Sequence, residues 1–414
     1  MCIRDSFGIW KSNDAGSTWT KIPVFIDGTT SLYQPMDLEI SPSTNKLWIS
    51  TTRNFDGLGA GVILVSNDDF TSFIKKYTVQ DGLRTELEIA KNGDVYVLAD
   101  VNNSAAPVTI IKSTNEFAST PTTITLPNDA DSGIPASDFT RGQSFYDLLI
   151  ESDPNNSNTI FVGGIDLFKS INGAVDSNSN NPWNQISKWS NNNDLATLNV
   201  SWVHADQHFI TFANTDSTKK LFGNDGGISY SKTKQDGTEE ITTRNNDFNT
   251  SQIYTIGVAP SEMFKIPSQI GGRTNVAFTS ASLAIDENDD VVAGGLQDNG
   301  SQIIADATNS TSFSVRHQGG DGAATMFSQD PTKRYLISNY VYDNAVVAYN
   351  FDITDIWGNA RGFYINSSNE SHGNFINEQA LDSKKGIFWT SVSMDLSRMQ
   401  GDITERPSIC SKRS

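Results

Sequence analysis

The chain has 414 residues and a formal charge of −18 at neutral pH, from 48 acidic and 30 basic residues. This negative charge would repel phosphate-rich surfaces, so neither a nucleic acid nor an anionic membrane surface is expected as a partner. Membrane insertion is not expected either, because no stretch approaches the ~20 apolar residues of a spanning helix. Basic ligands, neutral glycans and metal cations are all compatible with this composition.

The two ends of the chain differ from its body. Both cysteines lie there, at Cys2 and Cys410, and a disulfide between them is not expected, since the two ends would have to meet. Residues 1–6 (MCIRDS) run directly into a strand-like segment, and we interpret them as a cloning or assembly scar that replaces the natural N-terminus and its signal peptide. Residues 7–400 are expected to form one domain, followed by an irregular tail at 401–414.

A complete turn motif follows the first strand-like segment, within the stretch FGIWKSNDAGSTW at residues 7–19. Ser and Asp side chains can bind neighbouring backbone amides, Gly accepts a positive φ, and an aromatic residue can pack against the returning strand. The pattern therefore predicts a hairpin cap in which the motif residues are structural. These residues are Ser12, Asp14, Gly16, Thr18 and Trp19.

Weaker copies of this strand and Ser turn recur along the chain. They centre on Ser66, Ser113, Ser170 and Ser231, at intervals of about 45 to 60 residues, which is slightly more than one propeller blade requires. The complete motif resembles the Asp-box, or bacterial neuraminidase repeat, of sialidase-like, sortilin-like and xyloglucanase-like β-propellers. The resemblance implies a β-propeller fold.

Short apolar segments alternate with turn clusters throughout, which indicates half-buried strands and no amphipathic helix. Segments such as residues 94–98 are predicted to be second strands, and an innermost strand precedes each of them, at residues 280–285 in the fifth blade. We predict an all-β protein, a β-propeller of four-stranded blades, with about six full blades over residues 36–366. Half-blades from residues 7–24 and 374–390 could join and close a seven-bladed ring without exposed sheet edges. A fragment of a larger propeller is the alternative. Residues 260–278 are interpreted as an insertion or long loop.

Four polar clusters lie in the second half of the chain: WVHADQH (202–208), GNDGG (223–227), LQDNG (296–300) and QGGDG (318–322). In the blade pattern the first and last enter innermost strands, and the other two follow second strands. All four should then lie at one mouth of the channel, opposite the Asp-box turns, where propellers bind ligands. The predicted ligand-binding residues are Trp202, His204, Asp206, His208, Asn224, Asp225, Gln297, Asp298, Asn299, His317 and Asp321.

The order of these clusters, HADQH, NDGG, QDNG and GGDG, resembles a group of bacterial Asp-box propeller proteins described as sialidase-like or sortilin-like. The resemblance covers residues 200–325. It implies a secreted, periplasmic or cell-surface location and carries no established activity.

A metal site is one interpretation of the first cluster. His204, Asp206 and His208 alternate with Trp202, so in an extended segment they would point to one side. Two His and one Asp could ligate Zn²⁺ or another divalent ion and leave a fourth position open. In the favoured interpretation these side chains instead brace the loops. A structural calcium at the Gly-flanked Asp residues is the only other cofactor considered.

Catalysis by paired carboxylates is a second interpretation. Two Asp residues facing a sugar could act as general acid and base for glycoside hydrolysis, as the xyloglucanase resemblance suggests. Asp beside Gly is also an ordinary turn former, and this structural interpretation is favoured. The catalytic candidates are Asp206, Asp225, Asp298 and Asp321.

Sialidase chemistry also needs an arginine cluster for the substrate carboxylate. Arg141, Arg244, Arg273 and Arg316 are available, but no Arg-Ile-Pro motif precedes them, so this activity is less favoured. The leading hypothesis is a non-catalytic recognition or scaffold module that binds an extracellular glycan or protein. A glycoside hydrolase is the alternative, and a metal-dependent lyase or hydrolase is the third.

Overall fold

A computed structural model describes most of the chain. The described residues are 8–67, 69–175, 181–213, 215–246, 251–263, 277–278, 283–284, 290–304, 306–308, 314–342, 346–354, 360–366, 375–377, 379–390 and 408–409. The interpretations of residues 1–6, of both cysteines, and of nearly all of 401–414 and 264–276 lie outside these ranges. The chain divides into two compact units, unit 1 from Met1 to Phe248 and unit 2 from Asn249 to Ser414.

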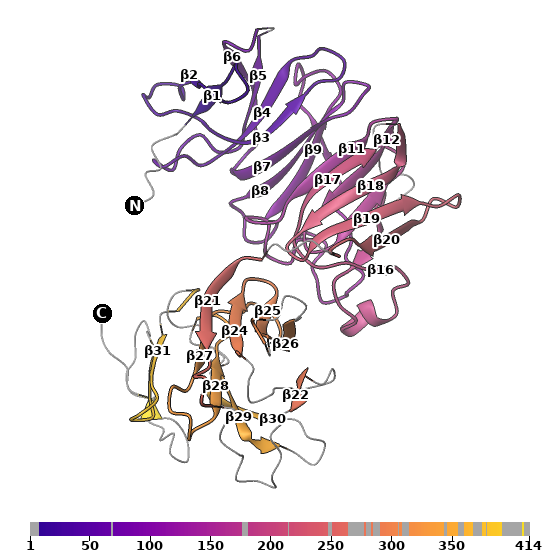
Figure 1. Cartoon of the computed structure of the whole chain (residues 1–414). Coiled ribbons are helices and arrows are strands. Elements are labelled where there is room, and N and C mark those ends of the chain that lie inside the picture. The colour runs from indigo at the N-terminus through magenta and orange to yellow at the C-terminus, as the bar shows by residue number, and fades with distance from the viewer. Residues whose placement is uncertain are drawn as a thin grey trace. The chain divides into compact units, whose positions relative to one another are not determined.

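Unit 1 contains four sheets, each of four antiparallel strands that follow one another in chain order. The first strand of each sheet contacts the first strand of the next (Figure 1). The strands are β3 (Gln34–Ile40), β4 (Leu47–Thr52), β5 (Val62–Ser66), β6 (Phe73–Thr78); β7 (Gly82–Ile89), β8 (Val95–Val101), β9 (Val108–Ser113), β10 (Thr122–Ile124); β11 (Leu149–Asp153), β12 (Asn156–Gly163), β13 (Leu167–Ser170), β14 (Asn184–Gln185); and β17 (Gln207–Ala213), β18 (Asp216–Asn224), β19 (Gly227–Thr233), β20 (Glu239–Thr243).

Smaller elements complete unit 1. A hairpin of β1 (Ile9–Lys11) and β2 (Thr20–Ile22) precedes the first sheet, and β15 (Ser187–Lys188) pairs in parallel with β16 (Ser201–Trp202). The described residues contain a single helical segment, the 3₁₀ turn η1 (Asn193–Ala196). Accordingly, none of the described helices is long and apolar enough to span a bilayer.

The core of unit 1 lies between neighbouring sheets. Successive side chains of a strand point to opposite faces, so each strand supplies two core layers. In β12, Ile160 and Val162 pack with Leu98 and Ile110 of the preceding sheet, whereas Phe161 packs with Phe222 of the following one. All six side chains are almost completely buried. Strands such as β5 and β8 are buried on both faces, so the prediction of half-buried strands is wrong for them, whereas β3 and β17 keep exposed positions.

Unit 2 contains two further sheets of four antiparallel strands. The strands are β21 (Ile253–Val258), β24 (Val292–Leu296), β25 (Gly300–Ile304), β26 (Ser314–Gln318); and β27 (Thr325–Phe327), β28 (Tyr335–Ser338), β29 (Val346–Thr354), β30 (Ala360–Asn366). A hairpin of β22 (Ala277–Phe278) and β23 (Leu283–Ala284) is inserted after β21. A last sheet joins β31 (Gln379–Asp382), β32 (Ile387–Thr390) and β33 (Ser408–Ile409).

These six sheets have the strand order of propeller blades, and β21 contacts β27 as the first strands do in unit 1. The fold is all-β, built of four-stranded β-propeller blades. Six four-stranded sheets lie over residues 34–366, and the number of blades in the complete propeller stays a prediction. One strand assignment was wrong: residues 280–285 were taken as the innermost strand of the fifth sheet, but β21 holds that position and pairs with β24.

The turn after β1 is the predicted hairpin cap. Ser12 Oγ accepts the amide of Gly16 at 2.8 Å, and Asp14 accepts the amide and the hydroxyl of Thr18 at 2.8 and 2.6 Å. Trp19 Nε1 donates to the carbonyl of Gly16 at 3.0 Å. The Thr18 bonds, followed by the bond from Ser12, lower the pKa of Asp14 to about 2. Gly16 has φ = 89°, a conformation that favours glycine.

The same turn recurs without Asp in the second blade of unit 1. Ser113 Oγ accepts the amide of Phe117 at 2.7 Å, and Asn115 replaces Asp14. Ser170 forms the equivalent bond to the amide of Ala174 at 3.1 Å. The hydroxyl therefore organises each turn, and the acidic residue is dispensable for the geometry.

We expect Ser113→Ala to lower the free energy of unfolding by about 1–2 kcal/mol, because Ser113 is buried and its loss leaves the Phe117 amide without a partner. Urea unfolding measures this. Ser12→Ala, at the more accessible turn, is the control and should cost less, since water can replace the hydroxyl. Equal costs at the two turns would contradict this account.

Candidate functional site

Two of the predicted polar clusters meet in unit 1. Residues 203–206 lead into β17, while Asp225 and Gly226 form the turn between β18 and β19. Gln207 of β17 is paired with Asn224 of β18, so the two loops end side by side. The amide of Asp225 donates to the carbonyl of Asp206 at 3.3 Å. The β17–β18 pairing thus brings together the HADQH and NDGG motifs, as the blade pattern predicted.

The carboxylate of Asp225 is held on both oxygens. His208 Nε2 donates to Oδ1 at 2.7 Å, and the hydroxyl of Tyr146 donates to Oδ2 at 2.9 Å. The Tyr146 and His208 rings also meet edge to face, with centroids 4.9 Å apart. Asp225 is mostly buried, with 12% of its side chain exposed, whereas His208 is 32% exposed. The result is a preorganised acidic group with an accessible histidine beside it.

Asp206 is the second acid of this cluster. It is 6% exposed, and Gln143 Nε2 donates to its Oδ1 at 3.4 Å. Carboxylate oxygens of Asp206 and Asp225 lie within 4.8 Å of each other. Asp206 has φ = 64°, so residues 203–206 do not form the continuous extended segment considered in the metal interpretation.

The histidines of that interpretation have separate surroundings. His204 Nδ1 lies 3.1 Å from the carbonyl oxygen of Ala205, and its ring fills the space in front of Gly226. A Cβ at Gly226 would come within 2.3 Å of His204 Cγ, which explains why this turn requires glycine. His208 contacts Asp225, as described above, and Trp202 is 59% exposed.

Asp147, at the start of the third blade, was not recognised in the sequence as a site residue. Its side chain is completely buried, and neither carboxylate oxygen has a hydrogen-bond partner on another residue. Burial, followed by the charge of Asp206, raises the pKa of Asp147 to about 9. A charged Asp in an otherwise apolar strand start was the only sequence signal. Asp147 could be recognised as a candidate site residue only once the positions of the neighbouring loops were known.

The QDNG and GGDG motifs meet within unit 2. The amide of Asp298 donates to Asp321 Oδ1 at 3.1 Å, and Asp298 has φ = 57°. Burial, followed by the charges of Asp321 and Asp298, raises the pKa of Tyr340. Asn299 Nδ2 donates to the carbonyl of Gln297 at 3.1 Å.

Two other predicted residues of unit 2 can be placed in part. The Gln297 side chain accepts a hydrogen bond from the Tyr254 hydroxyl. His317 lies in β26, but its side chain falls outside the described residues.

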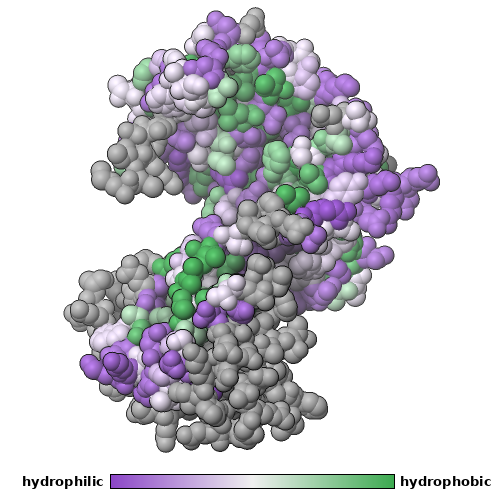
Figure 2. Space-filling view, viewed as in Figure 1, coloured by the Kyte–Doolittle hydropathy of each residue, from purple (hydrophilic) through white to green (hydrophobic). Residues whose placement is uncertain are grey.

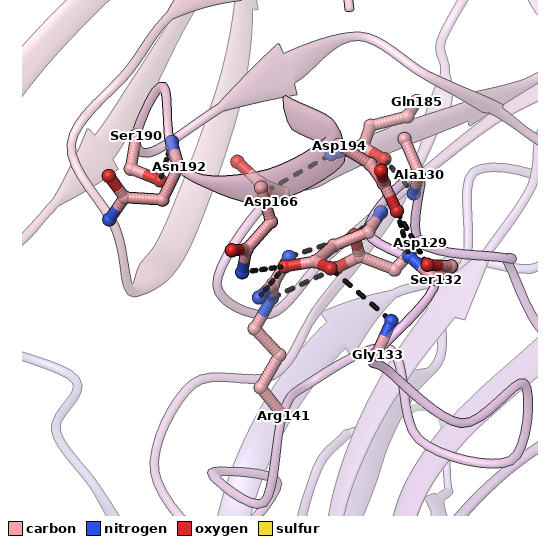
Figure 3. Close-up of polar contacts among 12 residues, drawn as sticks. Asp129, Ala130, Ser132, Gly133, Arg141, Asp166, Gln185, Ser190, Asn192 and Asp194 are labelled. Atoms are coloured by element: carbon pink, nitrogen blue, oxygen red, sulfur yellow. Dashed lines mark hydrogen bonds and ion pairs between the residues drawn. The ribbon is translucent and has the colours of Figure 1, made fainter. Parts of the chain in front are cut away.

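The arginines considered as a carboxylate-binding cluster of a sialidase have different surroundings. Arg141 forms a bidentate pair with Asp129 at 2.9 and 2.8 Å and reaches Asp131 at 3.3 Å (Figure 3). Arg244 lies over the ring of Tyr230, 5.0 Å from its centroid. Arg316 is exposed in β26, and Arg273 lies outside the described residues. Arg141 therefore neutralises the protein's own carboxylates and organises a loop.

A second acidic group, also missed in the sequence, lies on the first strands of three successive blades. Glu39 of β3, Glu88 of β7 and Glu151 of β11 bring carboxylate oxygens within 4.8 Å of one another. Burial, followed by the charge of Glu88, raises the pKa of Glu39 to about 8. Burial also raises the pKa of Glu88 and of Glu151. The Ser152 hydroxyl donates a hydrogen bond to Glu88. We call these residues the glutamate trio.

No protein-family model and no curated protein matches the chain. Among solved structures, YCF48 bound to a D1 peptide is 9% identical, with a TM-score of 0.32 over 76% of this chain and 78% of that one. A protein from Lactobacillus plantarum is 14% identical, with a TM-score of 0.34 over 84% and 88% of the two chains. Similarity at this level carries no information on ligand or activity, so function is argued from the site alone.

Proposed function

We propose that the chain is a non-catalytic recognition module that binds an extracellular protein or glycan through the Asp206, His208 and Asp225 loops. One observation carries the proposal: both oxygens of Asp225 already accept hydrogen bonds, from His208 and Tyr146. A carboxylate held in this way is a rigid recognition group, and its proton transfer to a substrate would require breaking one of these bonds. A secreted, periplasmic or cell-surface location is part of the proposal and rests on the resemblance of residues 200–325.

The surroundings of these residues suit ligand contact. Trp202, Phe209 and Phe145 are 59%, 62% and 68% exposed, and each lies within two residues of His204, His208 or Tyr146 in the sequence. Exposed aromatic faces offer apolar stacking surfaces and attract cations. The visible surface of unit 1 is otherwise a mixture of hydrophilic and small hydrophobic areas (Figure 2). Aromatic faces beside fixed acids favour hydroxyl-rich or cationic ligand groups.

Binding to arrays of neutral and sialylated glycans and of basic peptides tests the proposal. We expect Trp202→Ala to weaken binding at least about tenfold, as the loss of an exposed aromatic anchor does. Trp19→Ala is the matched control, because Trp19 is also 59% exposed but belongs to the Asp-box turn. Equal loss in both variants, or binding to neither array, would contradict recognition at this site.

A glycoside hydrolase is the second candidate, favoured by the approach of Asp206 and Asp225 to within 4.8 Å. Retaining enzymes place their two carboxyl groups about 5–5.5 Å apart. Release of reducing ends from a polysaccharide panel by the parent chain, but not by Asp225→Asn, would replace the recognition proposal with this one. No release by either chain favours recognition.

A further inference from the structure

Three segments of unit 1 are joined into one surface around the recognition residues. They are residues 125–148, which lead into the third blade, residues 186–206, which lead into the fourth, and the turn at 225–226. Hydrogen bonds between the segments run from Asn193 to Asp131, from Gln143 to Asp206 and from Tyr146 to Asp225. We call the surface formed by these three segments the acidic face.

Acidic residues outnumber basic ones on the acidic face. It contains seven acids and two bases, and the excess remains even when Asp147, whose pKa is raised to about 9, keeps its proton. Arg141 pairs with Asp129 and Asp131. Lys188 is 9% exposed and donates to two backbone carbonyls. Both bases are therefore engaged within the protein, and a cation that approaches the face meets negative charge. The acids are Asp129, Asp131, Asp138, Asp147, Asp194, Asp206 and Asp225.

The other end of the blades carries lysines. In a four-stranded antiparallel sheet, the turns after the first and third strands lie opposite the connections that form the acidic face. Lys46, Lys91 and Lys234 lie in such turns. Turns of this type also meet across neighbouring blades, since Lys169 Nζ donates to the carbonyl of Gly237 at 3.2 Å. The charge of unit 1 is thus divided between its two ends, and a basic partner would be directed to the acidic face.

Exposed aromatic rings lie among the acids of this face. Phe145 is 68% exposed and Trp202 is 59% exposed. Ammonium and guanidinium groups are attracted to the faces of such rings, and a guanidinium can also stack on them. Arg141 shows this arrangement within the protein, 6.0 Å from the ring centroid of Trp189. A neutral glycan could stack on the same rings but would gain nothing from the excess of acids.

We infer that the acidic face binds an arginine- or lysine-rich segment of a partner protein. The inference rests on the recognition function proposed above, because it names the partner of the same loops. Carboxylates of the face would pair with the basic side chains, and the exposed rings would cover their apolar stems. The charge of the segment, more than its shape, would then determine binding.

The test is fluorescence anisotropy of the full chain with two labelled peptides. One is a short peptide of arginine, lysine, glycine and serine. The other is identical except that citrulline replaces arginine and acetyl-lysine replaces lysine, which removes the charge and keeps the length. We expect the basic peptide to bind at least about tenfold more tightly at low salt, and its advantage to shrink as NaCl is added. Equal affinity for the two peptides would overturn the inference.

Asp194→Asn places the binding on the acidic face. Asp194 is exposed, and the amide and hydroxyl of Ser132 donate to its carboxylate at 3.0 and 2.5 Å (Figure 3). The hydroxyl bond, followed by the amide bond, lowers the pKa of Asp194, so the carboxyl is charged at neutral pH. Its loss should weaken binding of the basic peptide about two- to fivefold.

Asp236→Asn is the matched control, because Asp236 is equally exposed and accepts the amide and hydroxyl of Thr238 at 3.0 and 2.7 Å. It lies in the turn after the third strand of the fourth blade, at the end that carries lysines. The control should bind the basic peptide as the parent does. Equal loss in the two variants would overturn the inference, since it would show attraction to the total charge of the chain.

Phe145→Leu is a second variant that leaves the bonds of Asp194 in place. It keeps an apolar side chain and removes the aromatic face, so binding of the basic peptide should weaken about two- to fivefold. Unchanged binding would remove the rings from the inferred surface and overturn the inference.

Glycan arrays separate this inference from the function on which it rests. Glycan binding that Trp202→Ala weakens, with no preference for the basic peptide, would overturn the inference and leave the recognition function standing. Binding to neither glycans nor peptides would overturn both.

Discussion

Replacing Glu239 by Gln is expected to lower the free energy of unfolding by about 3–5 kcal/mol, the usual result of removing one partner from a buried ion pair. Glu239 has no exposed side-chain surface and accepts Lys169 Nζ at 2.7 Å and Lys220 Nζ at 2.9 Å. The hydroxyls of Ser231 and Thr233 donate to it at 2.6 and 2.8 Å. The variant would leave two nearly buried ammonium groups without a neutralising charge.

Glu239 should also contribute to the fall in the free energy of unfolding at acid pH. Burial acts to raise the pKa of Glu239, but the hydrogen bond from Lys169 and the charge of Lys220 outweigh it, so the pKa falls below its usual value. A carboxyl with a depressed folded-state pKa stabilises the fold above its unfolded pKa of about 4.3 and loses that contribution as the pH falls. The Gln variant should therefore lose less stability than the parent on acidification from pH 6 to pH 3.

Chemical denaturation at pH 7 measures the first effect, and repeated curves between pH 3 and pH 6 measure the second. Glu240→Gln is the control, because Glu240 pairs with Lys234 at 3.5 Å between side chains that are 61% and 52% exposed. That pair should contribute no more than about 1 kcal/mol. Similar losses in the two variants would mean that the Glu239 cluster is not a buried charge network in solution.

Local chemistry explains what could be predicted from the sequence. The turn at Ser12 and Asp14 is completed within a few residues, so its motif contains all the information that the hydrogen bonds require. The second strands of the blades were equally clear, because runs such as residues 94–98 are apolar on both faces. The blade order then predicted correctly that the loops of His208 and Asp225 would meet.

Features that depend on distant pairing could not be predicted. The innermost strand of the fifth sheet was placed at residues 280–285, since that segment directly precedes β24. The actual partner, β21, lies more than thirty residues earlier, and nothing in either segment encodes the pairing. Asp147 was missed for a related reason. One acid at the start of a strand looks solvent-exposed in the sequence, whereas the fold buries Asp147 completely.

The glutamate trio also depends on packing between distant strands and could not be predicted from the sequence. It leads to the second prediction with a large expected effect on stability. Glu39 and Glu88 alternate with apolar residues in their strands, which usually marks a solvent-facing side. The packing of first strand against first strand instead brings their carboxyl groups within 4.8 Å. Each pKa is raised, chiefly by burial, so the folded chain retains protons that the unfolded chain releases.

The sign of the pH dependence follows from these shifts. Raised folded-state pKa values make the contribution of the trio to stability greatest below the unfolded pKa of about 4.3. The pKa of Glu39 lies at about 8. As the pH rises toward this value, the folded state must either hold protons that the solution increasingly removes or place negative carboxylates side by side, and both cost free energy. The free energy of unfolding should therefore fall between pH 5 and pH 8, by up to about 1.4 kcal/mol per pH unit for each retained proton.

Glu151→Gln is expected to raise the free energy of unfolding by about 1–3 kcal/mol at pH 8. Burial raises the pKa of Glu151, so the parent chain must take up a proton there on folding, whereas Gln is neutral at every pH and keeps a polar side chain of the same size. The gain should shrink toward pH 5, where the trio of the parent chain is protonated. Denaturation curves in chelator, which removes any bound cation, provide the measurement. Glu116→Gln is the control, since Glu116 pairs with Lys76 and its side chain is 41% exposed. A gain that does not depend on pH would attribute the effect to packing and leave the trio without a role in proton retention.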